Sequence, residues 1–237
     1  MNSYRFTSAE LTILINHMTG GRLLEKTAAL PELQVDAQAL EAAEESLLEQ
    51  GLLVSLPFEE VSGVTSQLAS VLSAAITPDR VCIVRTVHGD HTDPPVFFSF
   101  TPQCVARNQV DEQGKHVFTE LADQEEAVGA ILAAGGAVER LPARKGAAKK
   151  APAKKSKAAA KPRPLADLLD EATRLVMLMV VADPAEPAPA AVSLSWLATE
   201  EGLWLVDGAS DGEAPLASPV SEKALRQRVA ALVVGEP

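Results

Sequence analysis

The chain has 237 residues, of which 47% are hydrophobic and 4% aromatic, a composition that suits one or two compact domains with aliphatic cores. Its longest apolar run, 175–182, is too short to span a bilayer, so we expect no membrane partner. The two cysteines, Cys82 and Cys104, show no disulfide or metal-binding spacing, and the first ten residues lack the apolar stretch of a secretion signal. We therefore expect a cytoplasmic protein.

Residues 1–60 contain two predicted amphipathic helices. The sequence TSAE at 7–10 has the pattern of a capping box, and the helix that it begins ends at Gly20. The second helix covers 40–48 and leads through Gly51 into a short strand, an order that resembles the end of a winged-helix domain. Such a domain reads DNA with basic or amide side chains, whereas these helices are acidic. We therefore favour a helical cap on the rest of the protein.

Residues 61–140 are predicted to form a first α+β half. Asp123, with Glu126 three residues later, is a typical start for the helix that closes this half. The predicted elements are a helix at 61–75, strands at 81–87, 96–100, 104–110 and 116–119, and a helix that ends at Gly135.

Residues 141–164 form a segment of unusual composition, with seven Lys, two Arg and four Pro but no acidic residue. Its few apolar side chains cannot offset the entropy of ordering, so we predict a disordered tether. It resembles the Lys-Ala-Pro tails of linker histones, which bind nucleic acid through charge, and a solubilising linker is the alternative. The other 213 residues hold 12 basic and 32 acidic side chains, a net charge of −20 that repels a phosphate backbone. The candidate polyanion contacts are Lys149, Lys150, Lys154, Lys155 and Lys157.

Residues 165–237 repeat the element order of the first half. In each half the first strand is a nearly continuous apolar run, which is typical of a central strand. We therefore predict an α+β fold of two pseudo-repeated helix–antiparallel sheet–helix halves, preceded by a winged-helix-like segment. We expect the helices to pack on one face of the sheet and to leave the other face free for a partner. The predicted elements are a helix at 165–169, strands at 174–182, 192–197, 203–207 and around Leu216, and a helix begun by Ser218 and Pro219.

Three aromatic residues on predicted strands are candidates for a protein-binding face: Phe97, Trp196 and Trp204. Successive side chains on a strand point to opposite faces, so Phe97 must leave the face that Phe98 and Phe100 share. Aromatic side chains on a half-exposed sheet suit a protein interface. Packing in the core is the other interpretation of each residue.

Metal-binding and catalytic patterns are weak in this sequence. His88, His91 and Asp93, with His116 on a neighbouring strand, are the best candidates for a metal site. They lie in a turn and match no established ligand spacing, so we expect a solvated hairpin loop. No nucleophile, base and oxyanion donor can be assembled from the motifs present. We predict no cofactor, no metal and no enzymatic activity.

Two stretches and the element order carry a family resemblance. The stretches are ALEAAEESLLEQGLLVS at 39–55 and GLWLVDG at 202–208, which precedes the final helix. With the two helix–sheet–helix halves they resemble the EspG-type chaperones of type VII secretion over about 8–234, and the Lys-rich tether departs from that family. The resemblance implies a cytoplasmic, non-catalytic protein that binds helical secretion substrates through its sheet and helices, without a metal or cofactor.

We predict a protein-binding module, a secretion-type chaperone or adaptor for a helical protein partner. The alternative is a nucleic-acid-associated protein that uses the basic tether and the winged-helix-like segment. Deleting 141–164 separates the two, because only the nucleic-acid function requires the tether. The sequence leaves the oligomeric state open.

Overall fold

Helices and one large sheet make up the described parts of the chain. The computed structural model describes residues 2–20, 33, 35–55, 62–137, 161–207 and 214–235. The helices in these parts are α1 (Ser8–Thr19), α2 (Ala37–Glu49), α3 (Ser66–Ile76), α4 (Gln124–Ala134), α5 (Leu165–Leu169) and α6 (Glu222–Val234). None of these helices has the length and apolar character that a membrane crossing requires.

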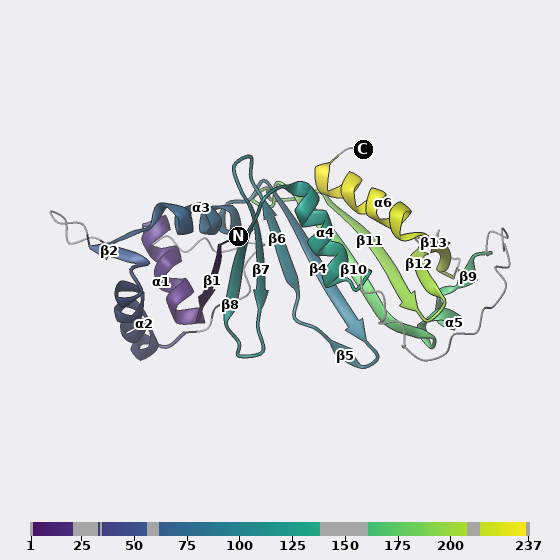
Figure 1. Cartoon of the computed structure of the whole chain (residues 1–237), viewed down its shortest axis with the longest axis horizontal. Helices are drawn as coiled ribbons and strands as arrows, with labels where there is room; N and C mark the ends of the chain where they lie inside the picture. Colours follow the sequence, from purple (N-terminus) through teal and green to yellow (C-terminus); the bar gives the residue numbers. More distant parts are fainter. Residues whose placement is uncertain are drawn as a thin grey trace, which may run out of the picture.

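One antiparallel sheet of 11 strands runs through the molecule (Figure 1). Its strands are β1 (Ser3–Phe6), β4 (Arg80–His88), β5 (His91–Thr92), β6 (Val96–Phe100), β7 (Val105–Val110), β8 (His116–Leu121), β9 (Arg163–Pro164), β10 (Ala172–Ala182), β11 (Ala191–Thr199), β12 (Gly202–Val206) and β13 (Leu216–Val220). Their order is β1-β8-β7-β6-β4-β10-β11-β12-β13-β9, and β5 pairs with β4. A separate two-stranded sheet joins β2 (Leu53–Ser55) and β3 (Ser62–Val64).

The antiparallel pair of β4 and β10 lies at the centre of the sheet. Outward from this pair, β6, β7 and β8 follow in chain order on one side and β11, β12 and β13 on the other, and β1 and β9 form the two edges. Both central strands are rich in β-branched and other apolar residues, which suit a pleated surface flanked by neighbours on both edges. The prediction that the first strand of each half is central is confirmed.

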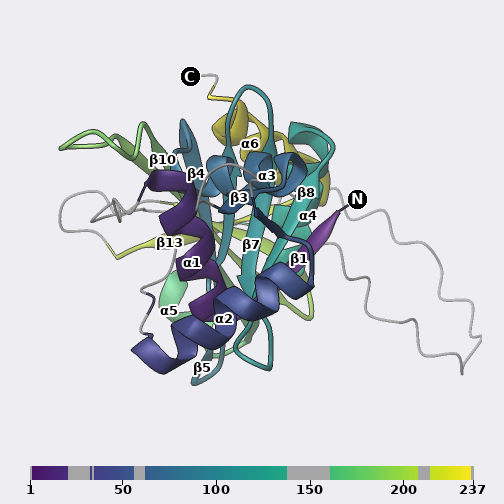
Figure 2. The ribbon, with the colours of Figure 1, turned by 90° about the vertical axis from the view of Figure 1, so that its left-hand side faces the viewer.

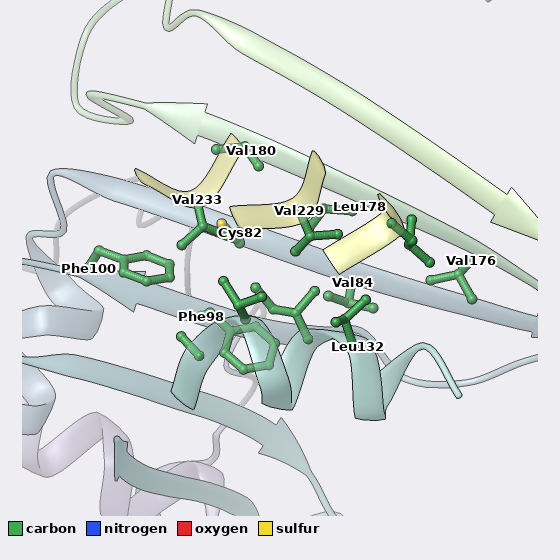
Figure 3. Close-up of a cluster of buried hydrophobic side chains, with 14 of the residues drawn as sticks. Cys82, Val84, Phe98, Phe100, Leu132, Val176, Leu178, Val180, Val229 and Val233 are labelled. Atoms are coloured by element: carbon green, nitrogen blue, oxygen red, sulfur yellow. The ribbon is translucent and has the colours of Figure 1, made fainter. Parts of the chain in front are cut away.

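Helices α4 and α6 cover one face of the sheet (Figure 1). Asp123 caps α4 by accepting a hydrogen bond of 2.8 Å from the amide of Glu126, as the sequence predicts. Apolar side chains of both helices pack on the central strands in the largest cluster of the core (Figure 3). Its buried members from β4, β6 and β10 are Cys82, Val84, Phe98, Phe100, Val176, Leu178 and Val180.

Each of these two helices ends against an arginine from the opposite half. Arg80, the first residue of β4, donates a hydrogen bond to the carbonyl of Val233 at the end of α6. Arg174 of β10 packs against Gly136 after α4, where a Cβ would collide with the guanidinium. A cation at the C-terminal end of a helix is stabilised by the helix dipole. The two halves therefore stabilise each other reciprocally.

The other face of the sheet carries two separate groups of helices. At one end, α1 and α3 pack around Phe6 and Phe118, and α2 joins them (Figure 2). At the other end, α5 places Leu168 against Leu197 and Trp204. The prediction that all helices lie on one face is therefore wrong. The outer strands carry large apolar side chains on both faces, and burying both requires helices on both.

Glu10 connects α1 to α2 and confirms the predicted capping box. Its carboxylate accepts hydrogen bonds from the Thr7 amide at 2.8 Å, the Ser46 hydroxyl at 3.0 Å and the Gln50 amide at 3.2 Å. Burial works against the charge of Glu10, but these hydrogen bonds hold its pKa below the ordinary value. The charged form of Glu10 therefore stabilises the packing of α1 on α2.

Two predicted boundaries in the second half differ from the structure. The last helix begins after Ser221, whose hydroxyl accepts a 3.2 Å hydrogen bond from a first-turn amide, whereas Ser218 and Pro219 lie in β13. Pro219 lies beyond the two β13 residues that pair with β9, and a proline is tolerated at such an edge. At the end of the predicted tether, Arg163 and Pro164 form β9, so the predicted disorder does not extend to 164.

Candidate protein-binding surface

The middle of the sheet is exposed on the face that carries α5. Along β10, Val176 and Leu178 are fully buried beneath α4 and α6. The alternate residues Met177 and Met179 are 37% and 38% exposed. Since successive side chains of a strand point to opposite faces, both methionines lie on the face opposite α4 and α6.

Strand pairing brings further residues beside the two methionines. Met179 lies opposite Ile83 of β4 and Ser193 of β11, and Ile83 in turn lies opposite Phe97 of β6. Met177 lies opposite Arg85. Side chains in such cross-strand pairs are direct neighbours. We call this set the central strip: Ile83, Arg85, Phe97, Met177, Met179 and Ser193.

Helices border the central strip on two sides. Helix α3 packs on β6 and β7, and α5 packs on β10 and β11. The strip crosses four neighbouring strands, β6, β4, β10 and β11. Adjacent strands are about 4.8 Å apart, so the strip is about 14 Å wide. An α-helix with its side chains is about 10–12 Å in diameter, which is comparable with the width of the strip.

The side chains of the central strip are apolar or hydroxyl-bearing, with one exception. Ile83 and Phe97 are half-buried, and Ser193 is exposed. Methionine side chains adapt to irregular apolar partners because they are unbranched and polarizable. The exception is Arg85, which is exposed and forms no ion pair with another described residue. This arrangement suits contact with the apolar side of another protein.

The structure corrects two of the three aromatic candidates. Trp196 is fully buried, and its ring packs so closely on Gly135 after α4 that a Cβ there would collide with it. Trp204 is 5% exposed, lies in the cluster under α5 and has the guanidinium of Arg163 5.6 Å from its ring centre. The prediction that Trp196 and Trp204 bind a partner is wrong, because helices cover the sheet above each ring. Phe97 lies in the central strip and remains a candidate.

The candidate polyanion contacts cannot be placed in the fold. Lys149, Lys150, Lys154, Lys155 and Lys157 all lie outside the described residues, so this part of the analysis stays a prediction. In residues 1–60, which were predicted to resemble a winged-helix domain, α2 exposes four carboxylates that would repel a phosphate backbone. They belong to Glu41, Glu44, Glu45 and Glu49.

The histidines of the metal hypothesis do not converge. The carboxylate of Asp93 lies 3.0 Å from the ring of His88 and 3.4 Å from that of His91. His116 is three strands away in β8, where its ring nitrogen is 3.4 Å from the Ser8 hydroxyl. In the described ranges, no three His, Cys, Asp or Glu side chains are grouped so that they could hold a metal ion.

The two cysteines are poor candidates for nucleophiles. Burial raises the pKa of the Cys82 thiol to about 12. Burial also raises the pKa of Cys104, and the nearby charge of Glu120 raises it further. Both side chains are free thiols that stay protonated near neutral pH, whereas the thiolate is the reactive form.

Sequence reasoning missed the two exposed methionines. The run RLVMLMVVA predicts a central strand that is covered by a helix, but the apolar pattern alone does not say which of its side chains face away from that helix. A finer signal is present in it. The buried positions Val176, Leu178 and Val180 hold branched side chains, while the alternate positions Met177 and Met179 hold flexible ones.

Comparison with known proteins adds a structural neighbour. No protein-family model matches the chain, and no curated protein matches its sequence. This fold is similar to that of the chaperone EspG5. EspG5, from the Mycobacterium tuberculosis type VII secretion system, was solved in complex with a PE25–PPE41 dimer. The similarity to EspG5 covers 98% of this chain and 96% of that chain, with a TM-score of 0.59 and 11% sequence identity.

At 11% identity, the similarity to EspG5 establishes the fold alone. The chain therefore has an EspG-like α+β architecture with a large antiparallel sheet, as the sequence resemblance implied. The coverage includes both halves and the N-terminal helices, so the similarity is not confined to one motif.

Proposed function

We propose that this chain is a non-catalytic, cytoplasmic chaperone or adaptor of the type VII secretion kind, which binds a helical protein partner at the central strip. The observation that carries the proposal is the exposed pair Met177 and Met179, which lies in the middle of the sheet between the two groups of helices on that face. The similarity in fold to EspG5, a chaperone bound to a protein dimer in its structure, covers nearly all of both chains and supports the same class of function.

The physical basis of binding is burial of the strip. Two methionines, Ile83 and Phe97 present a continuous apolar row that water now contacts. Removing such side chains from water is favourable by about 25 cal/mol per Å² of apolar area. A helix placed between α3 and α5 covers this row and leaves its polar face in solvent. The strip in turn covers the apolar face of the partner helix.

The two halves are, in this proposal, a pseudo-repeat. The outward strand order from β4 and β10 supports it, and so do Arg80 and Arg174, which lie against the ends of α6 and α4. The segment before α3 serves as a helical cap over one end of the sheet, in keeping with its acidic surface. The free thiols suit a reducing compartment.

Site-specific photo-crosslinking in the native cytoplasm tests this function. A photoreactive amino acid replaces Met179 in one variant and Arg228, an exposed residue of α6 on the opposite face, in the matched control. We expect one protein to crosslink at 179 and not at 228, and its sequence to contain an amphipathic helix. Crosslinking should survive nuclease treatment and deletion of 141–160, a deletion that keeps β9 intact.

Two results would contradict the proposal. Equal crosslinking at 179 and 228 would mean that the strip has no preferred partner. Loss of the crosslinked product after nuclease treatment or tether deletion would instead favour the nucleic-acid alternative.

A further inference from the structure

Arg85 is the one charged residue of the central strip. It lies on β4 opposite Met177, on the exposed face, and makes no ion pair or side-chain hydrogen bond with another described residue. Other described arginines form ion pairs with carboxylates, as Arg163 does with Glu171 at 2.7 Å. Arg85 is exposed, so among the described residues nothing shields its guanidinium from water.

A partner that covers the strip changes the surroundings of Arg85. A partner that covers Met177 also covers Arg85, its cross-strand neighbour on the same face, and removes water from the guanidinium. A guanidinium cannot lose its proton, so it stays charged when it is desolvated. An unpaired charge in an interface is strongly unfavourable, whereas a carboxylate that accepts two parallel hydrogen bonds offsets its desolvation.

We propose that the strip selects helices that carry one aspartate or glutamate within their apolar face, and that this carboxylate pairs with Arg85. The inference rests on the proposed function, because it concerns the partner of the same surface. Along β10, Met177 and Met179 are two residues apart, a distance of about 6.6 Å. Residues i and i+4 of a helix are separated by about 6 Å along its axis. For a helix that lies along the central strands, the acid is therefore one turn from the apolar residue that contacts Met179.

The test uses helical hairpins selected for binding. A library of designed helical-hairpin proteins, randomised at the exposed positions of one helix, is selected against the full-length chain. Binders that lose affinity for Met179→Asp are kept, since these occupy the strip. In each binder the acid nearest the apolar face is changed to Gln and to Lys. Affinities are then measured for the unchanged chain, for Arg85→Glu and for the control Arg228→Glu, which changes the net charge equally on the other face.

We expect most strip binders to carry an Asp or Glu at the predicted position. Its change to Lys should weaken binding to the unchanged chain by about tenfold or more. Arg85→Glu should reverse this preference so that the Lys version binds better, and Arg228→Glu should leave it unaltered. Circular dichroism of each variant checks that the fold is retained.

The failure of this inference and of the proposed function look different. Some binders could depend on Met179 and yet rank their acid, Gln and Lys versions in the same order of affinity for Arg85→Glu as for the unchanged chain. That result would overturn the pairing with Arg85 and leave the strip as a binding site. If no selected hairpin depends on Met177 or Met179, the strip is not a helix-binding surface, and both proposals are overturned.

Discussion

On one face of β10, Val176, Leu178 and Val180 lie beneath α4 and α6, while on the other face Met177 and Met179 keep more than a third of their surface exposed. The strand, the neighbours and the hydrogen-bonding pattern are the same for both sets. Only the cover differs. A central strand such as β10 can be apolar throughout and still have helices on only one face. The type of apolar residue then distinguishes the two faces, because branched side chains face the helices and methionines face solvent.

The largest effect is expected where the covered face is most tightly packed. Trp196→Ala should lower the free energy of unfolding by about 3–5 kcal/mol, because it leaves a cavity against α4. Trp196→Phe should cost much less, since the indole N–H has no hydrogen-bond partner within the described residues. Urea unfolding followed by circular dichroism measures both. Similar losses for the two variants would mean that the ring does not fill the space beside Gly135.

Matched truncations on β10 compare the two faces directly. Leu178→Ala should cost about 2–5 kcal/mol of stability, the range for a fully buried leucine. Met179→Ala, one residue away, should cost no more than about 1 kcal/mol, because its side chain already contacts water. Both values come from chemical denaturation of the isolated chain. Equal costs would contradict the assignment of the exposed face.

The reciprocal arginines should each contribute a smaller amount. Arg80→Ala and Arg174→Ala should each lower stability by about 0.5–2 kcal/mol, because each removes a cation from the C-terminal end of a helix. The two losses should be similar if the halves are equivalent. Thermal unfolding of each variant and of the double variant measures them. If only one of the two variants loses stability, the two halves are not equivalent.

The pH dependence of stability probes the end of the sheet under α1. Burial lowers the pKa of His116 below its ordinary value of 6.5, so the folded state favours the neutral ring. The contribution of His116 to stability is therefore present above that value and is lost as the pH falls through the folded pKa. The unfolding free energy should therefore drop more between pH 7.5 and 5.5 in the unchanged chain than in His116→Gln. An equal drop in both proteins would mean that His116 titrates normally.

Most of the elements could be predicted from local patterns, while their arrangement could not. The capping box at Glu10, the Asp123 cap and the apolar central strands depend on neighbouring residues, and sequence periodicity records them. The strand β1 was missed because Ser3–Phe6 is short and its partner β8 is more than a hundred residues away. Which helix covers which face depends on contacts of that long range.

The candidate site was predictable only in part. The alternation along β6 placed Phe97 on the opposite face from Phe98, and Phe97 lies in the central strip. The same reasoning could not tell that α5 covers Trp204 and that α4 lies against Trp196, because an aromatic strand residue has the same pattern under a helix and in solvent. For the same reason, the apolar run that contains Met177 and Met179 does not show which of its side chains face solvent.

Methyl NMR of methionine tests the central claim most directly. The chain has four methionines, and Met18 of α1 lies beside the N-terminal core cluster, outside the strip. In the ¹³C-methyl spectrum, a soluble paramagnetic agent should broaden Met177 and Met179 more than Met18. The partner protein that photo-crosslinking at position 179 identifies is then added. It should shift the signals of Met177 and Met179 and shield them from the agent, while the signal of Met18 stays unchanged. A shift confined to Met18, or strip signals still accessible in the complex, would contradict binding at the central strip.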